Sequence, residues 1–218
     1  MSGMRRITTF SSHRKPPEVT PAQILRIEEW ERNEQREKWR GRLQASGIPK
    51  RYRQASLKAC PPEVRAYAEG FGKETERGLI LRGGFGTGKT TAACAVAIEV
   101  AKRHPVRFVT MPDLIARATD FERGGMDCFR NTRLLVLDDL GKERGTEFAV
   151  SEVYAAIDFR IREGKPTVIT TNLDSAGLMR HFKRGTSDDV AGSIVSRILG
   201  MCDVVRMDGA DWRLQKPR

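Results

Sequence analysis

The stretch "GLILRGGFGTGKTTAACAVAIEVAKR", residues 78–103, holds the strongest structural signal in the sequence. It begins with a short apolar run typical of a buried strand, passes through a glycine-rich turn, and ends in small residues that favour a helix. Within it, Gly83, Gly88, Lys89 and Thr90 satisfy the pattern G-x-x-x-x-G-K-[ST]. This pattern between a strand and a helix predicts a loop that binds the phosphates of a nucleotide.

The residue types of this loop suit phosphate binding. Gly84, Gly86 and Gly88 let the backbone curl so that N–H groups point inward, and the dipole of the following helix adds positive potential. Lys89 is expected to reach the terminal phosphates, and the hydroxyl of Thr90 is expected to ligate Mg²⁺. A glycine turn without a ligand has no use for these two side chains together. The residues expected to surround ATP are Gly84, Phe85, Gly86, Thr87, Gly88, Lys89, Thr90 and Thr91.

A second polar pair follows the apolar run "RLLVLDDL", residues 133–140. Such a run predicts a buried strand that delivers Asp138 to its carboxyl end, where the carboxylate holds Mg²⁺ directly or through a water. Asp139 follows on the opposite side and is placed to act as general base toward an attacking water, a role that Glu usually fills. Because Asp is one methylene shorter than Glu, we expect slow hydrolysis. The alternative is that both aspartates only cap the loop after the strand.

Three later residues complete the candidate catalytic set. Asn172 ends the strand-like run "VITTN", and its amide is placed to hydrogen-bond the γ-phosphate or the lytic water. Arg197 and Arg213 are of the type that neutralises transition-state charge when a neighbouring subunit contributes it. Either arginine would serve equally well as a surface residue.

The rest of the chain predicts an α/β fold with an appended helix. Five apolar runs alternate with helical stretches, which favours a parallel sheet covered on both faces; they are residues 78–83, 106–110, 133–140, 166–172 and 202–207. Thr20, Pro21 and Gln23 form a helix start, and the helix is expected to run to about Ala45. We therefore expect a basic tail and helical arm over residues 1–46 and an ATPase domain over residues 47–218. The arm either docks on a partner or is an exposed charged helix.

Composition limits the partners, metal sites and cell compartments that we expect for this protein. The formal charge is +11, and residues 1–53 hold 13 basic but only 6 acidic side chains. This excess favours an anionic partner, either nucleic acid or an acidic protein face, over a merely solvated surface. The four cysteines lack the close pairs of a zinc ribbon and are expected to be reduced and buried. No apolar run approaches the roughly 20 residues of a membrane helix, and no secretory signal is evident, so we expect a cytoplasmic protein with no membrane partner.

Taken in order, these residues resemble the AAA+ ATPases and, within them, the replicative helicase loaders of the DnaC and DnaI type. The resemblance covers about residues 46–214 and rests on "SGIPKRYR", "GGFGTGKT", "LLVLDDLG", "VITTN", "IVSRIL" and "GADWR". It implies a five-stranded sheet with no sizeable C-terminal lid domain. It also implies an arginine finger at Arg197, sensors at Asn172 and Arg213, and an adenine pocket that includes Ile48 and Pro49.

The same resemblance implies where DNA is bound. Loaders of this type grip single-stranded DNA between the second and third strands and just after the paired aspartates. Aromatic side chains there stack on bases, and nearby cations neutralise phosphates; the matching residues are Phe121, Lys142, Arg144, Thr146 and Phe148. The two phenylalanines would otherwise be ordinary core residues.

The leading hypothesis is an ATP-assembled loader that places a replicative hexameric helicase, docked on the amino-terminal arm, on single-stranded DNA. It implies self-association through the ATP site. An ATPase of the IstB type shares the core and would instead bind duplex DNA and recruit a transposase. A small P-loop kinase, or a DNA-binding module that keeps ATP unhydrolysed, is a further alternative. Two departures from the family pattern are Asp139 in place of Glu and an arm without a cysteine cluster.

Overall fold

The computed structural model describes residues 20–73, 77–118, 127–142, 146–209 and 211. The chain divides into two compact units between Gln35 and Arg36. This division lies within α1 (Pro21–Ala45), whereas the sequence placed the end of the arm at residue 46. The assignment of separate functions to the two parts stays a prediction.

The start of α1 is a capping box, as the sequence predicted. The backbone N–H of Thr20 donates to Oε1 of Gln23 at 2.8 Å, and the backbone N–H of Gln23 donates to Oγ1 of Thr20 at 3.4 Å. In the first unit the apolar side chains of α1 are exposed; they are Ile24, Leu25, Ile27 and Trp30. This part of the helix therefore gains no stability from a core of its own.

The last turns of α1 belong to the second unit. Trp39 and Leu43 pack against its hydrophobic core, and Arg42 donates to the carbonyl oxygens of Ala101 and Lys102 at 3.1 and 2.7 Å. These contacts fix the carboxyl end of α1 on the second unit.

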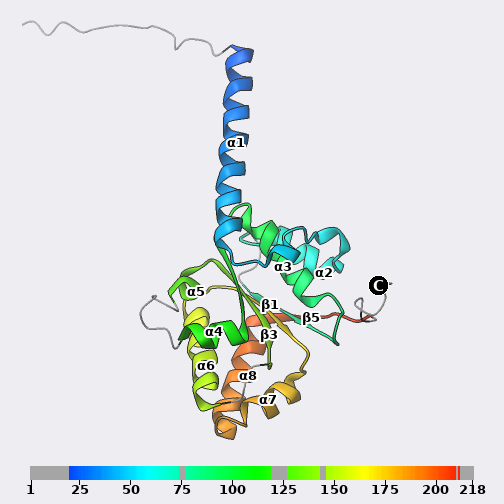
Figure 1. Cartoon of the computed structure of the whole chain (residues 1–218), viewed down its shortest axis with the longest axis vertical. Coiled ribbons are helices and arrows are strands. Elements are labelled where there is room, and N and C mark those ends of the chain that lie inside the picture. The colour runs from blue at the N-terminus through cyan, green and yellow to red at the C-terminus, as the bar shows by residue number, and fades with distance from the viewer. Residues whose placement is uncertain (1–19, 74–76, 119–126, 143–145, 210, 212–218) are drawn as a thin grey trace, which may run out of the picture. The chain divides into compact units, whose positions relative to one another are not determined.

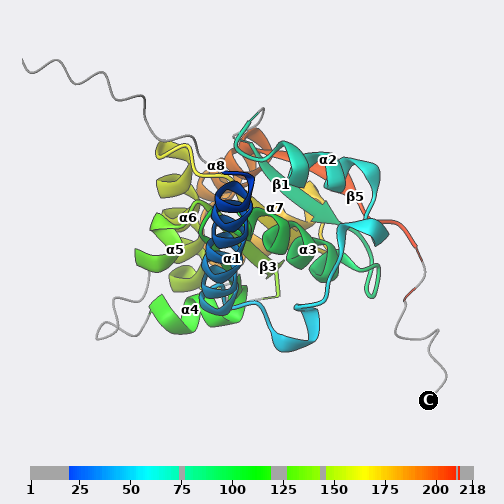
Figure 2. The same ribbon diagram turned by 90° about the horizontal axis from the view of Figure 1, so that it is seen from above.

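The second unit contains a five-stranded parallel sheet, which confirms the predicted fold class. Its strands are β1 (Gly78–Arg82), β2 (Val106–Thr110), β3 (Leu134–Leu140), β4 (Thr167–Thr171) and β5 (Cys202–Arg206). Their order is β2-β3-β4-β1-β5, and every pair of neighbours is parallel. Figure 2 shows β5 beside β1 at one end of this order. All carboxyl ends therefore lie along one edge of the sheet.

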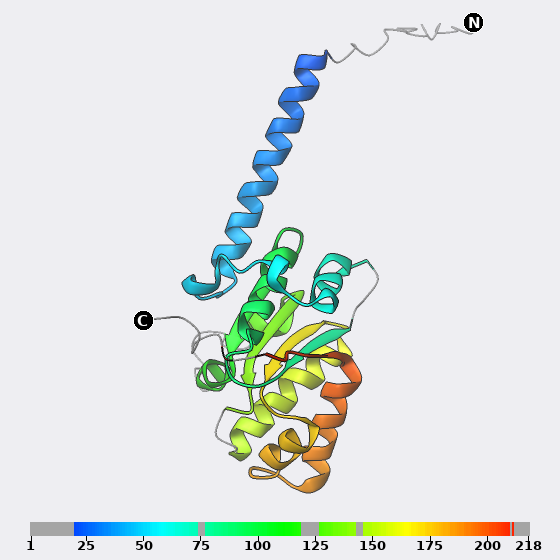
Figure 3. The ribbon, with the colours of Figure 1, turned by 90° about the vertical axis from the view of Figure 1, so that its right-hand side faces the viewer.

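Helices cover both faces of the sheet (Figures 1 and 3). One face carries α2 (Pro62–Gly70) and α3 (Lys89–Ala101), which follow the short helices η1 (Lys50–Tyr52) and η2 (Leu57–Ala59). The other face carries α4 (Met111–Ala118), α5 (Asp127–Asn131), α6 (Glu147–Arg162), α7 (Ser175–Phe182) and α8 (Asp188–Met201). After β5 the structure describes residues 207–209 and 211, and no helical lid lies among them.

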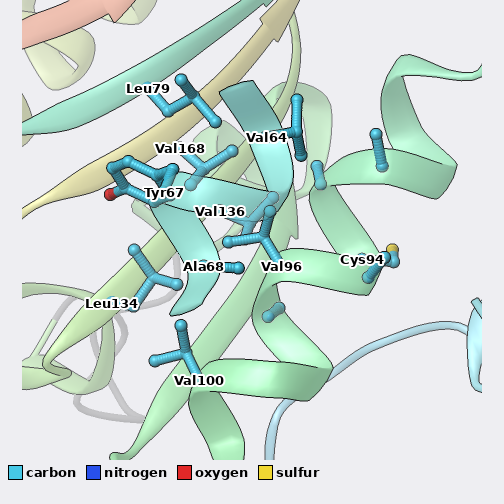
Figure 4. Packing of buried hydrophobic residues seen from close by; sticks show 14 of the residues in the cluster. Val64, Tyr67, Ala68, Leu79, Cys94, Val96, Val100, Leu134, Val136 and Val168 are labelled. Atoms are coloured by element: carbon cyan, nitrogen blue, oxygen red, sulfur yellow. The ribbon is translucent and has the colours of Figure 1, made fainter. Parts of the chain in front are cut away.

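The core is built by strict alternation along the strands. In β3, Leu134 and Val136 point to the side of α2 and α3, in the cluster that also contains Val96 and Val100 (Figure 4). Leu135 and Leu137 point to the opposite cluster under α4, α6 and α8. Because successive side chains of a strand face opposite sides, a continuous apolar run is required here, and this is the pattern that the sequence showed.

The predicted burial of the cysteines is correct for three of them and wrong for Cys128. Cys60, Cys94 and Cys202 are buried free thiols, whereas Cys128 is exposed. Cys128 lies in the short helix α5, whose core contact is made by the neighbouring Phe129. Among the described residues, no helix combines the length and apolar character needed to cross a membrane.

A buried arginine ties the amino ends of β3 and β4 to α6. Arg160 is 1% exposed, and burial lowers the pKa of its guanidinium to about 10. Nε donates to the hydroxyl of Thr167 at 2.7 Å. The other nitrogens donate to several carbonyl oxygens, most closely to those of Pro166 at 2.6 Å and Phe129 at 2.8 Å. The carbonyl oxygen of Thr132 accepts another at 3.2 Å. Among the residues that the structure describes, this buried charge is thus balanced mainly by backbone dipoles.

We predict that Arg160→Met lowers the free energy of unfolding by about 3 kcal/mol or more, because it leaves several buried acceptors without a donor. Urea denaturation followed by circular dichroism measures this change. Arg162→Met, on the same helix with a side chain that is 68% exposed, is the matched control and should change the free energy by less than about 0.5 kcal/mol. Equal stability of both variants would contradict the prediction.

Candidate nucleotide-binding site

A cavity of about 620 Å³ opens at the carboxyl edge of the sheet, beside the glycine-rich loop. Segments far apart in the sequence meet there: η1 and η2, the loop and start of α3, the end of β3, and the residue after β4. The lining residues are Arg51, Tyr52, Ser56, Ala59, Cys60, Phe85, Gly86, Thr87, Gly88, Lys89, Thr90, Thr91, Ala92, Asp138, Asp139, Lys142, Asn172 and Met207. Most of the predicted phosphate-binding residues therefore face one space.

The loop requires glycine for two reasons. Gly86 and Gly88 have φ angles of 68° and 85°, a left-handed conformation that other residues adopt at a cost. In addition, a Cβ at Gly83 would overlap the carbonyl oxygen of Met207, and a Cβ at Gly86 would overlap the carboxylate of Asp211. The loop is thus packed against the segment that follows β5. Gly84 has no positive φ, so the curl comes from the other two glycines.

Lys89 lies beneath the loop at the start of α3. Its side chain is nearly buried, and Nζ donates to the carbonyl oxygens of Gly83 and Gly84 at 3.0 and 2.5 Å. These bonds hold the ammonium against the loop, where the positive end of the dipole of α3 also lies. A charged donor at this position is suited to a phosphate oxygen.

Thr90, Asp138 and Thr170 form a hydrogen-bonded group across three elements. The hydroxyls of Thr90 and Thr170 both donate to Oδ1 of Asp138, at 2.9 and 2.6 Å. Burial raises the pKa of the Asp138 carboxyl, the bond from Thr170 and the weaker bond from Thr90 lower it, and the charge of Asp139 raises it. Thr170 was not among the residues that the sequence singled out, although it lies two residues before Asn172.

Two hard oxygen ligands are therefore adjacent at the edge of the sheet. The hydroxyl of Thr90 and the carboxylate of Asp138 are of the donor type that Mg²⁺ prefers, and they lie within hydrogen-bond distance of each other. This donor set fits a magnesium ion that also binds phosphate oxygens.

A bulge brings Asp139 to the same cavity as Asp138. Strict alternation would turn these neighbours to opposite faces, but the pairing of β3 with β4 shifts between Leu137 and Leu140. Asp139 adopts a left-handed φ of 63°, and its backbone N–H donates to the hydroxyl of Thr170 at 2.8 Å. The sequence expectation that Asp139 lies on the other side of the strand is thus modified by a local irregularity.

The carboxylate of Asp139 is already engaged. Oδ2 accepts a bond from Nζ of Lys142 at 2.6 Å, and both side chains line the cavity. The sequence had assigned Lys142 to DNA phosphates. In this structure the lysine instead neutralises the candidate general base.

Asn172 lines the cavity, whereas Arg197 does not. Arg197 lies on α8 and is turned toward α6: it bonds to the hydroxyl of Ser193, lies 3.6 Å from a carboxylate oxygen of Asp158, and stacks on the ring of Tyr154 at 5.1 Å. An arginine outside its own cavity fits a role at a neighbour's site, and that role stays a prediction. Arg213 lies outside the described residues.

The predicted adenine-pocket residues are not among those that line the cavity. Ile48 is 2% exposed and packs in the core, and Pro49 precedes η1. The nearby Arg51 and Tyr52 line the cavity instead, with the guanidinium 4.6 Å from the ring centre. The signal was present in the same stretch, "SGIPKRYR", but the helical turn of η1 decides which residues face inward.

The candidate DNA-binding residues are described only in part. Thr146 is exposed before α6, and Phe148 is 43% exposed near the start of that helix, so it is not a core residue. Phe121 and Arg144 lie outside the described residues. Of the five predicted DNA-binding residues, the structure therefore describes Lys142, Thr146 and Phe148.

Comparison with known proteins matches residues 66–218 to the family of IstB-like ATP binding proteins. The replicative helicase loader DnaI of Bacillus subtilis is 30% identical over 148 residues, which cover 63% of this chain and 48% of that protein. A putative ATP-binding protein in an insertion sequence of Mycobacterium tuberculosis is 29% identical over 147 residues, which cover 63% and 56%. The chain spans about half the length of the curated relatives it matches.

A solved structure has the same arrangement of elements. The crystal structure of DnaI superimposes with a TM-score of 0.65 at 27% identity, covering 75% of this chain and 96% of that chain. The match extends the sequence similarity to the three-dimensional fold.

We predict that Thr170→Val weakens the dependence of nucleotide affinity on Mg²⁺. Valine keeps the shape but removes the donor to Asp138 and the acceptor for the N–H of Asp139, so the free energy of unfolding should fall by roughly 1–3 kcal/mol. Fluorescence titration with a labelled ATP analogue at several Mg²⁺ concentrations provides the measurement.

Two further variants separate the effect of Thr170 on the position of Asp138 from its effect on the stability of the protein. Thr170→Ser keeps the hydroxyl and should restore the Mg²⁺ dependence. Thr132→Val removes a buried hydroxyl that bonds to Pro105 at the opposite edge, so it should lower stability without changing that dependence. Loss of the Mg²⁺ dependence in Thr132→Val would refute the positioning role of Thr170.

Proposed function

The chain belongs to the family of IstB-like ATP binding proteins, a branch of the AAA+ ATPases, and on this premise we propose that it binds ATP with Mg²⁺ and hydrolyses it slowly. The observation that supports this most is the convergence of Lys89, Thr90, Asp138 and Asn172 on one cavity. These residues come from three separate segments. Phosphoryl transfer requires that the phosphates are bound, that their charge is neutralised and that the attacking water is oriented, and these side chains are of the types that do so.

The chain's own residues suggest how hydrolysis proceeds. Lys89 offsets negative charge on the terminal phosphates, and Mg²⁺, when held by Thr90 and Asp138, supplies further positive charge there. The amide of Asn172 orients the γ-phosphate or the water. Asp139 accepts a proton from the water only after its bond to Lys142 is exchanged. The short side chain of Asp139 and this competing bond both favour slow turnover.

We also propose that the active assembly is an oligomer in which Arg197 acts on the nucleotide of a neighbour. Arg197 is absent from its own cavity, and its partner Asp158 is only partly buried. Exposed or half-exposed ion pairs contribute about 0–1 kcal/mol, so a neighbour's phosphate can compete for the guanidinium.

A mixing experiment tests this arrangement. Lys89→Ala should lose nucleotide binding, and Arg197→Ala should bind ATP normally but lose at least about 10-fold in hydrolysis, because each lacks a different half of the shared site. Mixing the two should restore part of the activity, since Lys89→Ala supplies Arg197 to the intact cavity of the other variant. Phosphate release is the readout. Normal hydrolysis by Arg197→Ala alone would exclude the finger.

The biological role that we propose is loading of a replicative hexameric helicase onto single-stranded DNA. The similarity to a replicative helicase loader supports it. The arm offers a docking element, because its apolar side chains in the first unit, including Ile27 and Trp30, are exposed. Exposed aromatic and aliphatic groups of this kind are typical anchors of protein interfaces.

A transposition role is the second candidate. It is favoured by the match to the IstB-like family and by the insertion-sequence relative at 29% identity. In this role the protein would bind duplex DNA and recruit a transposase. The ATP site would be used in the same way, so the partner distinguishes the two roles.

We predict that the full-length chain retains the replicative helicase of its own cell in a pull-down, and that Ile27→Ser with Trp30→Ser reduces retention at least about 10-fold. Arg26→Ser with Glu29→Ser, on the same helix, is the polar control and should retain the helicase. A truncation should end before Arg36, because Trp39, Arg42 and Leu43 are part of the second unit and pack within it. Retention of a transposase and no helicase would favour the second role.

A further inference from the structure

The amino edge of the sheet, opposite the nucleotide cavity, gathers positive charge from four separate segments. We define the basic edge as Arg42, Arg103, Arg130, Arg133 and Lys165. Arg42 is in the last turn of α1, Arg103 follows α3, Arg130 and Arg133 precede β3, and Lys165 precedes β4. Because the strands are all parallel, the segments that enter them lie together at this edge.

Contacts join these cations into one surface. Arg133 lies 5.9 Å from the ring centre of Phe71, whose ring packs against that of His104 at 5.6 Å. Burial, and then the charges of Arg133, Arg103 and Arg42, lower the pKa of this imidazole. Arg130 and Lys165 lie on the ring of Phe159, at 5.7 and 5.3 Å from its centre. The two groups are linked through Arg160, whose guanidinium binds the carbonyl oxygens of Thr132 and Pro166 between them.

Few carboxylates offset this charge among the described residues. Glu99 is paired with Lys102 at 2.7 Å, and Asp203 is paired with Arg77 at 2.8 Å. Two exposed carboxylates are close to the edge in the sequence: Glu163 lies near Lys165, and Glu69 lies two residues before Phe71. Arg130, Arg133 and Lys165 lie over aromatic rings. Arg42 caps the carbonyl end of α3, and Nζ of Lys165 lies 3.4 Å from the side-chain oxygen of Asn131.

We propose that the basic edge binds the phosphate backbone of DNA, as a surface separate from the nucleotide cavity and from the predicted DNA residues after the paired aspartates. Four of the five cations are arginines, whose planar guanidinium suits phosphate oxygens. The ring of Phe71 carries Arg133, and the ring of Phe159 carries Arg130 and Lys165, so neither of these two described rings is available to stack on bases. Binding at this edge is therefore electrostatic and independent of base sequence.

The proposal does not depend on the choice between helicase loading and transposition, because either process brings the protein to DNA. The proposal also gives a function, binding of DNA phosphates, to cations of this chain of charge +11 that lie outside the amino-terminal arm. An acidic protein face would be the competing partner for this charge. Protein interfaces combine arginine with aromatic residues, whereas the rings described at this edge, Phe71 and Phe159, already carry cations, and this favours DNA over such a face.

The test measures the affinity of the full chain for a single-stranded and a duplex oligonucleotide of equal length at several salt concentrations. The variant carries Arg103→Gln, Arg130→Gln and Lys165→Gln. We expect the slope of log affinity against log salt to fall by about 2 to 3, and affinity at low salt to fall about 10- to 100-fold, on at least one of the two DNAs. Binding of a labelled ATP analogue should be unchanged.

The matched control removes the same charge from the opposite edge. Arg180→Gln, Lys183→Gln and Arg184→Gln lie on and just after α7, which follows the carboxyl end of β4. Three outcomes would overturn the proposal. They are an equal loss of DNA affinity in this control, an unchanged salt slope in the first variant, and no DNA binding by the parent chain. Arg103→Glu with Lys165→Glu leaves the half-buried Arg130 in place, so it gives the answer if the triple variant melts early. Loss of ATP binding would concern the proposed nucleotide site and not this edge.

Discussion

The buried carboxylate of Asp138 is the constraint on which the rest of the site depends. A charge that is only 4% exposed at the end of a central strand is unfavourable unless donors surround it. Thr90 supplies one hydroxyl from α3, and Thr170 supplies another from β4. The same carboxylate that suits Mg²⁺ thus fixes the phosphate-binding helix to the sheet. The carboxylate of Asp138 thus serves both the stability of the fold and the proposed nucleotide site, so a change of Thr90 or Thr170 affects both.

The direction of the strands separates two kinds of charge. At the carboxyl edge, two aspartates and an electropositive loop surround a cavity that suits a nucleotide. At the amino edge, Arg160 is buried among carbonyl oxygens, and further cations lie over it. A parallel sheet produces this separation because every chain entry lies on one edge and every exit on the other. On the two proposals, each edge would bind a different anionic ligand.

Sequence reasoning succeeded where the signal is local. Strands buried on both faces must be continuously apolar, so the runs around Leu79, Val136 and Ile169 marked their positions within one or two residues. It failed where tertiary contacts decide the outcome. Arg160 has the sequence context of an exposed helix end, yet it is the largest of the fully buried side chains that the structure describes. The bulge at Asp139, the inward turn of Tyr52 and the assembly of the basic edge likewise depend on segments that are distant in the sequence.

Two cations that the sequence assigned to partners are bound within the chain. Lys142 is held by Asp139, and Arg197 lies against Asp158. All four side chains keep substantial exposure, and solvent screening limits such pairs to about 0–1 kcal/mol. Each pair is therefore weak enough to be exchanged for a phosphate from a nucleotide or a neighbour's site. On the proposed function, Lys142 would neutralise the general base Asp139 in a single chain, and Asp158 would hold Arg197 away from any nucleotide. Assembly would break both pairs. Slow hydrolysis by the isolated chain then follows from the same two contacts.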